Sequence, residues 1–340
     1  MEGKKELKIN KKHGGKEFKS TFHFVGLVKP HIKGIGDKAQ AMPLYTEKET
    51  INGNLKRDVQ FDIYTSEFNN IKVATWGMEQ EYVYPYSSVD KKSVEIKWND
   101  RDNKSKYPND SYHLILPPWD IAKAINDNVE FDKWIEVKGH YEFGKYTNDE
   151  GKEYPTIKRI IDSFDLVEDG QEIKIGKNKT INYICDFKAS DFQEINRFDL
   201  EIGIKSTYEN EDNIIINGVF LAYGKEASVP QDIKLTVFKE RDEKLAKGFT
   251  KMNRGDYIKV IGVDNNRPEF SLIPKTNIDD DDPFADLENQ EEEYKYAISG
   301  NKKGLEIVRI VKGSFSKGML SEEELEINEV PFIDTEDPFQ

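Results

Sequence analysis

The chain has 340 residues, enough for two domains, with 36% hydrophobic residues, 34% charged residues and a formal net charge of −14 at pH 7. Its one cysteine, Cys185, excludes an intramolecular disulfide framework and a cysteine-cluster zinc site. The sequence has no N-terminal hydrophobic segment and no apolar run of about 18 residues. We therefore expect a cytoplasmic protein that makes no contact with membranes.

Acidic residues gather towards the C-terminal end. From Asn277 onward there are 18 acidic and 6 basic residues, a net charge of −12, whereas the preceding residues carry only −2. We expect residues 276–340 to form a largely disordered acidic tail, in which alternation at 294–311 allows a small hairpin. The nearly neutral body can still bind a polyanion through local basic patches.

The first half of the chain predicts one β-barrel. Residues 1–17 are rich in lysine and glycine and predict a flexible basic arm, which is either simply solvated or holds phosphates. Alternating apolar residues predict strands at 18–28, 59–63, 71–73, 94–98, 112–116, 134–143 and 156–164, with a helix at 118–126. Two long loops, 30–54 and 144–155, would flank a binding face. This order predicts an OB barrel over 18–165, followed by a polar linker at 166–180.

The second half repeats this order over residues 181–275. Strict alternation at 232–237 predicts a strand, and Leu245 and Phe249 have the spacing of a short helix on a sheet. A turn at 254–256 then leads to a strand at 257–261 with a bulge at Gly262, and to a last strand at 269–273. The predicted fold class is therefore all-β with short helices, as tandem OB-fold barrels.

One stretch resembles a known family. The sequence KGFTKMNRGDYIKVIG, residues 247–262, resembles the passage from helix to fourth strand in bacterial and phage single-stranded DNA-binding proteins. The resemblance implies that the chain binds and protects single-stranded DNA during replication, recombination or repair. It implies neither a cofactor nor an enzymatic activity. A composition rich in lysine, asparagine and glutamate suits a phage, whose protein would work in the bacterial host cell.

Binding to single strands requires cations for the phosphates and exposed aromatic rings for the bases. The loops and strands of the first barrel offer Lys33, Lys38, Tyr45, Trp76, Tyr84, Tyr86, Lys145, Tyr146, Tyr154, Lys158 and Arg159. The second barrel offers Lys234, Arg254, Lys259 and Arg267, although nearby acids make a solvated face equally consistent with that pattern. Trp98, Tyr141 and Phe143 each lie on the same face of a predicted strand as a Val or Ile. This position favours the core for these three side chains.

The tail carries two copies of an Asp-Pro-Phe motif. They are Asp282-Pro283-Phe284 and Asp337-Pro338-Phe339, each preceded by acidic residues. Tails of bacterial single-stranded DNA-binding proteins are similar, and the resemblance implies docking of replication or recombination proteins. Gln340 follows Phe339 and departs from that pattern, because the terminal carboxylate is not on the phenylalanine.

Two alternatives stay open. The barrels could belong to a protein-interaction scaffold that uses the Asp-Pro-Phe motifs and binds no nucleic acid. A nucleic-acid enzyme with scattered carboxylates is the other alternative, although no Walker loop, His-Glu-x-x-His helix or nucleophile elbow is present. The five histidines show no metal-ligand spacing, so we expect no metal, no cofactor and no catalysis.

Overall fold

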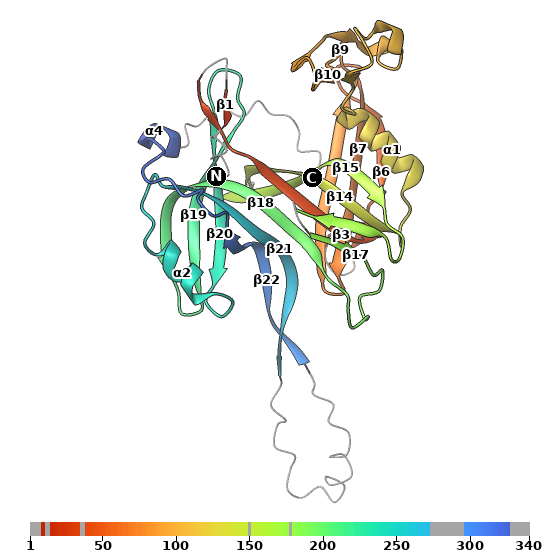
Figure 1. Ribbon diagram of the computed structural model, residues 1–340. Coiled ribbons are helices and arrows are strands. Elements are labelled where there is room, and N and C mark those ends of the chain that lie inside the picture. Colours follow the sequence, from red (N-terminus) through yellow and green to blue (C-terminus); the bar gives the residue numbers. More distant parts are fainter. Residues whose placement is uncertain are drawn as a thin grey trace, which may run out of the picture.

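A computed structural model describes residues 8–10, 14–34, 38–148, 151–176, 179–272 and 296–326; within these, the side chains of 153–154, 269–272 and 296–301 are not described. Two β-barrels lie side by side, with β3, β18 and β21 between them (Figure 1). None of the described helices is long and apolar enough to cross a membrane.

The first barrel, barrel 1, has the strand order of an OB fold. It consists of β3 (Ser20–Lys29), β7 (Leu55–Ser66), β8 (Asn69–Met78), β14 (Trp134–Thr147) and β15 (Glu153–Leu166). β7 pairs with β3 and β8, β8 pairs in parallel with β15, and β14 closes the barrel between β15 and β3. Helix α1 (Pro118–Asn128) lies in the chain between the third and fourth strands, as predicted.

The second barrel, barrel 2, has the same order. Its elements are β18 (Ile195–Glu209), β19 (Asn213–Ala222), β20 (Val229–Phe238), α2 (Glu243–Phe249), β21 (Tyr257–Leu272) and β22 (Tyr296–Ile310). β19 pairs with β18 and β20, β20 pairs in parallel with β22, and β21 lies between β22 and β18. The prediction of an all-β fold with short helices, arranged as tandem OB barrels, is confirmed.

The fifth strand of barrel 2 is not where the sequence pattern placed it. Residues Glu269–Leu272 continue β21, because bulges at 261/262 and 269/270 bend this strand without ending it. The fifth strand is β22, whose Leu305 and Ile307 are buried in the core. The domain limit at residue 275 and the separate hairpin at 294–311 were therefore wrong, since β22 completes the barrel.

Residues after β22 also belong to the folded body. Ser316 bridges to Tyr257, and Leu320 and Leu325 are buried at the end of barrel 2. Helix α4 (Glu322–Leu325) starts with a capping box in which Ser321 is the N-cap. The acidic tail predicted from residue 276 is thus interrupted by a folded segment at 296–326, while 273–295 and 327–340 lie outside the described residues.

The predicted linker at 166–180 is partly a packed hairpin. β16 (Glu172–Ile175) pairs with β17 (Lys179–Asn182), and Ile173 and Tyr183 are buried in a small second core with Val25. This packing replaces the expected solvated connection, and the first strand of barrel 2 begins at Ile195 instead of near Ile181. The hairpin therefore belongs to the join between the barrels.

The two first strands pair with each other and relate the barrels. β3 and β18 are antiparallel, and Phe22 lies opposite Phe198. A Cβ atom added to Gly139 of β14 would lie 2.6 Å from the Phe22 ring, and one added to Gly262 of β21 would lie 2.3 Å from the Phe198 ring. Each glycine follows a bulge in a fourth strand and allows a ring to lie against the backbone. These positions are equivalent in the two barrels.

Short elements decorate barrel 1. They are β4 (Ile32–Lys33), β5 (Gln40–Ala41) and β6 (Tyr45–Glu49), and, in an insertion at 79–117, β9 (Tyr82–Val83), β10 (Tyr86–Ser87), β11 (Lys92–Ser93), β12 (Ile96–Lys97) and β13 (Tyr112–His113). The hairpin of β1 (Lys8–Ile9) and β2 (Lys16–Glu17) contacts barrel 2 instead, because Lys16 donates hydrogen bonds to the backbone oxygen of Met319 and to Glu324, so the described part of the predicted flexible arm is packed. β6 extends the barrel sheet beside β7. The insertion lies beyond the end of the barrel, next to α1 (Figure 1).

Candidate nucleic-acid interface

The outer face of β7 and β8 is the surface on which OB barrels commonly hold oligonucleotides. Strand register places Asp58 opposite Trp76, and Lys56 opposite Met78. The alternating residues, such as Val59 and Val73, are buried in the core. Further along the outer face, Asp62 lies opposite Lys72 and Tyr64 opposite Asn70, and Lys48 of β6 lies beside Lys56. We call Lys48, Lys56, Tyr64, Lys72 and Trp76 the barrel-1 face.

Trp76 is the open aromatic ring of the barrel-1 face. Its side chain is 38% exposed on the third strand. The ammonium of Lys56 lies 5.2 Å from the ring centroid and 2.9 Å from the Asp58 carboxylate. An exposed indole beside an ammonium offers a base a stacking surface and offers its phosphate a cation.

The two carboxylates on this face have basic partners. Asp58 contacts Lys56, and Asp62 lies 2.9 Å from Nδ1 of His31. His31 stands at the start of the 30–54 loop, so the hydrogen bond ties the root of this loop to the face. Lys33 and Lys38, both exposed, follow His31 in the loop. The hydrogen bond therefore places the start of the loop that carries Lys33 and Lys38 at the edge of the barrel-1 face.

β15 extends the face on its other side. Ile160 pairs with Ala74 of β8, so Lys158, two residues earlier, points the same way as Lys72 and Trp76. Lys145 and Tyr146 are exposed where β14 runs towards the second loop, and Tyr146 lies opposite Tyr154 in the register. The side chain of Tyr154 is outside the described residues.

Tyr45 lies on the opposite side of its strand from the barrel-1 face. It pairs with Val59 and packs against the core, and its hydroxyl donates a 2.7 Å hydrogen bond to Glu47. Arg57 donates to the same carboxylate at 2.6 Å and stacks on Trp119. Burial, followed by the hydrogen bond to Glu47, raises the pKa of Tyr45 to about 12. The structure thus places Tyr45 among structural contacts of β6.

Arg159 is committed to the contact between the barrels. Its guanidinium donates hydrogen bonds of 2.6 and 2.8 Å to Asp264, whose side chain is fully buried. The Tyr141 hydroxyl donates to the same carboxylate at 3.0 Å. Burial, then the negative charge of Asp264, raises the pKa of Tyr141 well above its usual value. The predicted role of Arg159 with phosphates competes with this buried ion pair.

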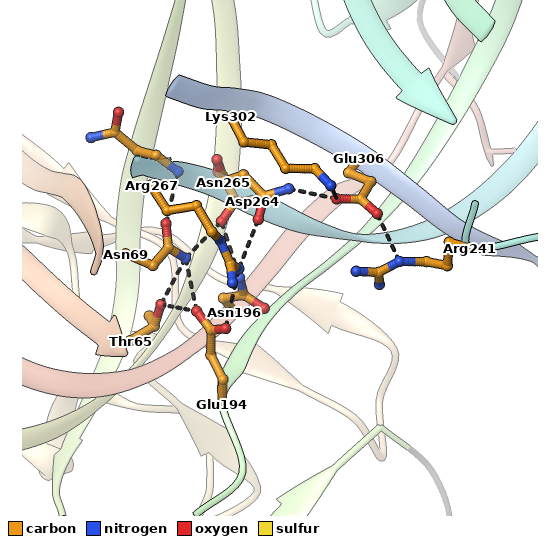
Figure 2. Close-up of polar contacts among 11 residues, drawn as sticks. Thr65, Asn69, Glu194, Asn196, Arg241, Asp264, Asn265, Arg267, Lys302 and Glu306 are labelled. Carbon is orange, nitrogen blue, oxygen red and sulfur yellow. Dashed lines mark hydrogen bonds and ion pairs between the residues drawn. The ribbon is translucent and has the colours of Figure 1, made fainter. Parts of the chain in front are cut away.

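A polar cluster surrounds the same segment of β21 (Figure 2). Glu194 accepts hydrogen bonds from Thr65 and Asn69 of barrel 1, and from Arg267 at 3.1 Å. The Asn69 amide also donates to the backbone oxygen of Asp264. These contacts join the turn between β7 and β8 to barrel 2, and they hold Arg267 away from the barrel-1 face.

Of the other predicted basic residues of barrel 2, two form ion pairs and one is exposed. Arg254 pairs with Glu322 at 2.8 Å, and Lys259 pairs with Glu201 at 2.5 Å. Lys234 is exposed on the outer face of β20. Only Lys234 among the four predicted residues lies on the face that corresponds to the barrel-1 face.

The tyrosines of the insertion form a separate exposed group. Tyr84 and Tyr86 are 57% and 41% exposed. The base of the insertion packs Trp98 against Trp119 of α1, and Arg101 stacks on Trp98 at 4.4 Å. Trp98, like Tyr141 and Phe143, is buried, which confirms that these three belong to the core. The insertion tyrosines are not part of the barrel-1 face.

Several residues of the two outer faces were missed by sequence reasoning, and an internal repeat points to two of them, Lys72 and Phe238. The third strands read IKVATW at 71–76 and IKLTVF at 233–238. Ala74 pairs with Ile160 of barrel 1 as Thr236 pairs with Glu306 of barrel 2. Lys72 and Trp76 are therefore equivalent to Lys234 and Phe238. Lys48, Lys56, Tyr64, Lys72 and Phe238 were not predicted as site residues.

Both Asp-Pro-Phe motifs lie outside the described residues; their members are Asp282, Pro283, Phe284, Asp337, Pro338 and Phe339.

No protein-family model matches this sequence, and no curated protein matches it either. Among solved structures, the chain is similar to the wild-type single-stranded DNA binding protein from Thermus aquaticus, with 13% identity and a TM-score of 0.37 over 76% of this chain and 98% of that one. A deletion mutant of the Thermus protein matches with 14% identity and a TM-score of 0.36, over 76% and 99% of the two chains. At this identity and TM-score the likeness carries no argument about function, which has to be inferred from the surface of the chain itself.

Proposed function

We propose that the chain binds single-stranded DNA with little sequence preference and protects it during replication, recombination or repair. The observation that supports this most is the position of Trp76, exposed on the third strand of an OB barrel among Lys48, Lys56 and Lys72. Stacking on an aromatic ring tolerates every base, and lysines contact phosphates without reading sequence.

A titration with oligo-dT, followed by tryptophan fluorescence at two salt concentrations, tests this function. We expect quenching, with an affinity that falls as salt rises, because phosphate contacts release counterions. Each lost phosphate contact lowers the slope of log affinity against log salt by about 0.7 on a single strand. Lys48→Met should therefore reduce the slope by about that amount.

A matched control is Lys123→Met on α1. Lys123 is half-exposed and contacts Asp127, away from the barrel-1 face, so this variant removes the same charge without a phosphate contact. Its salt slope should equal that of the unmodified chain. An affinity that stays flat between low and high salt would refute the proposal.

We also propose that the acidic tail recruits replication or recombination proteins through Asp282-Pro283-Phe284 and Asp337-Pro338-Phe339, and competes with DNA for the basic faces. A chain that ends at Glu326 keeps β22 and α4 and loses four carboxylates, Glu329, Asp334, Glu336 and Asp337. We expect this variant to bind oligo-dT more tightly at low salt, where electrostatic competition is strongest. Equal affinity would exclude competition by this part of the tail.

A further inference from the structure

Barrel 2 carries an aromatic ring at the position equivalent to Trp76, but a lysine covers it. Phe238 lies on the outer face of β20, opposite Asn213, while Val237 beside it is buried in the core. The ammonium of Lys302, from β22, lies only 3.6 Å from the centroid of the Phe238 ring. In barrel 1, Lys56 is farther from the Trp76 centroid, at 5.2 Å.

Carboxylates hold this lysine in place. The ammonium of Lys302 lies 3.6 Å from Glu306 and 3.9 Å from Glu240. Glu306 is only 2% exposed, and it also contacts Arg241 at 2.9 Å and accepts a 2.7 Å hydrogen bond from Asn265 (Figure 2). Arg241 and Asn265 fix the buried Glu306 carboxylate, and its negative charge attracts the Lys302 ammonium across 3.6 Å.

Barrel 1 has an apolar residue at the position of Glu306. The backbone oxygens of Ile160 and Glu306 lie against equivalent glycines, and the two residues make the equivalent parallel pairs with Ala74 and Thr236. The position of Glu306 is therefore occupied by the apolar Ile160 in barrel 1. Among the described residues, a buried glutamate beside the ring lysine is found in barrel 2, whereas in barrel 1 Lys56 pairs with Asp58 and lies farther from its ring.

We propose that Phe238 is a second base-stacking position, and that Lys302, anchored by Glu306, covers it until a DNA strand displaces the ammonium. This inference rests on the proposed function and adds an order of occupation to it. A base cannot stack on the covered face of Phe238 while Lys302 lies there. A single strand therefore occupies Trp76 first and reaches Phe238 at higher DNA concentration.

A pair of fluorescent reporters tests this order in the full chain. In the first, Trp76 is the natural reporter, because it is the exposed one of the four tryptophans and the other three give the same background in both chains. In the second, Phe238→Trp is combined with Trp76→Phe, so that the exposed indole moves to barrel 2 and an aromatic ring stays in barrel 1. Oligo-dT should quench the barrel-2 reporter at concentrations about 3- to 10-fold higher than it quenches Trp76, the range expected for displacing a cation from a ring.

Removal of the cover gives the decisive comparison. Lys302→Met in the barrel-2 reporter should lower the oligo-dT concentration for half quenching by about 3- to 10-fold, because the ring becomes accessible. The control is Lys303→Met, which removes the same charge from the next, exposed residue of β22. This control should weaken binding slightly, since a positive charge is lost.

The outcomes separate the two proposals. If Lys302→Met weakens binding as Lys303→Met does, Lys302 is a phosphate contact and the cover is refuted. If Trp76 is quenched and the barrel-2 reporter is never quenched, Phe238 is not a stacking position although the chain binds DNA. If neither reporter is quenched, the proposed function itself fails.

Discussion

The two barrels share a framework and differ in what is built on it. Both have the same strand order and a glycine beneath the phenylalanine of the first strand. On the third strand, both have a lysine and, four residues later, an aromatic residue. Barrel 1 carries the 30–54 loop and the 79–117 insertion, whereas in barrel 2 only residues 210–212 separate β18 from β19. Longer loops add little closure entropy, so loops can diverge while the core stays the same.

The same positions also carry different charges. Glu136 lies three residues before Gly139 of barrel 1 and contacts His23. The equivalent residue of barrel 2, three residues before Gly262, is Lys259, which contacts Glu201. A lysine ammonium lies 5.2 Å from the centroid of the third-strand ring in barrel 1 and 3.6 Å from it in barrel 2. The comparison teaches that the repeated scaffold fixes where a site lies, while the polar residues around it set how accessible the site is.

The largest expected effect comes from the ion pair that joins the barrels. Asp264→Ala leaves the Arg159 guanidinium in the interface without its carboxylate, so we expect the free energy of unfolding to fall by about 3 to 5 kcal/mol. Urea denaturation would measure the loss. An unfolding curve that separates into two transitions would show that the barrels had been held together mainly by this contact. A loss below about 1 kcal/mol would contradict its structural role.

Two glycine substitutions test whether the barrels are equivalent. Gly139→Ala and Gly262→Ala place a Cβ within 2.0 Å of a backbone oxygen in either barrel, so each should lower the free energy of unfolding by about 3 kcal/mol. Gly248→Ala is the control, because no atom lies within 4 Å of its added Cβ and it is in helix α2. This change should stabilise the chain by about 0.5 to 1 kcal/mol. A large effect in one barrel only would break the equivalence.

Trp76→Leu should weaken oligo-dT binding by about 2 kcal/mol, or roughly 30-fold, since one base loses its stacking surface. Phe238→Leu should weaken it less than tenfold, because the Lys302 cover already limits stacking there. Trp76→Phe keeps an aromatic ring and should retain most of the affinity. Isothermal titration calorimetry would measure all three, and equal losses for the two leucine variants would remove the asymmetry between the barrels.

The smallest effect concerns acid stability. The hydrogen bond from His23, together with Lys138, holds the pKa of Glu136 at about 2 against its ordinary 4.5. A depressed carboxyl pKa stabilises the fold above pH 4.5, and this contribution is lost as the pH falls from about 4.5 to about 2. Glu136→Gln should therefore reduce the acid-induced loss of unfolding free energy by roughly 1 to 2 kcal/mol. An unchanged pH profile of the urea midpoint would contradict this assignment.

Local patterns in the sequence predicted much of the framework. Alternating residues identified the main strands of barrel 1 and the strands at 232–237 and 257–261 of barrel 2, and the spacing of Leu245 and Phe249 identified α2. The third-strand repeat that points to Phe238 is also visible in the sequence. These features depend on neighbours within a few residues, which is why a single sequence reveals them.

The remaining features depend on distant partners. Arg159 has the sequence environment of a basic surface, but its partner Asp264 is 105 residues away. β22 has a weak alternation, and 23 residues separate it from β21, so nothing local shows that it closes the barrel. Likewise, the cover on Phe238 requires a lysine from another strand. Sequence reasoning found the fold and the exposed Trp76, while long-range pairing decided which cations remain on the surface.

Photo-crosslinking with oligo-deoxyuridine that carries 5-iodouracil would test the central claim most directly, because the base reacts with aromatic side chains on which it stacks. The account predicts crosslinks at Trp76 at low DNA concentration and at Phe238 at higher concentration, with Lys302→Met advancing the second. Crosslinks confined to Tyr84 and Tyr86 of the insertion, or a complete absence of crosslinks, would contradict DNA binding on the barrel faces.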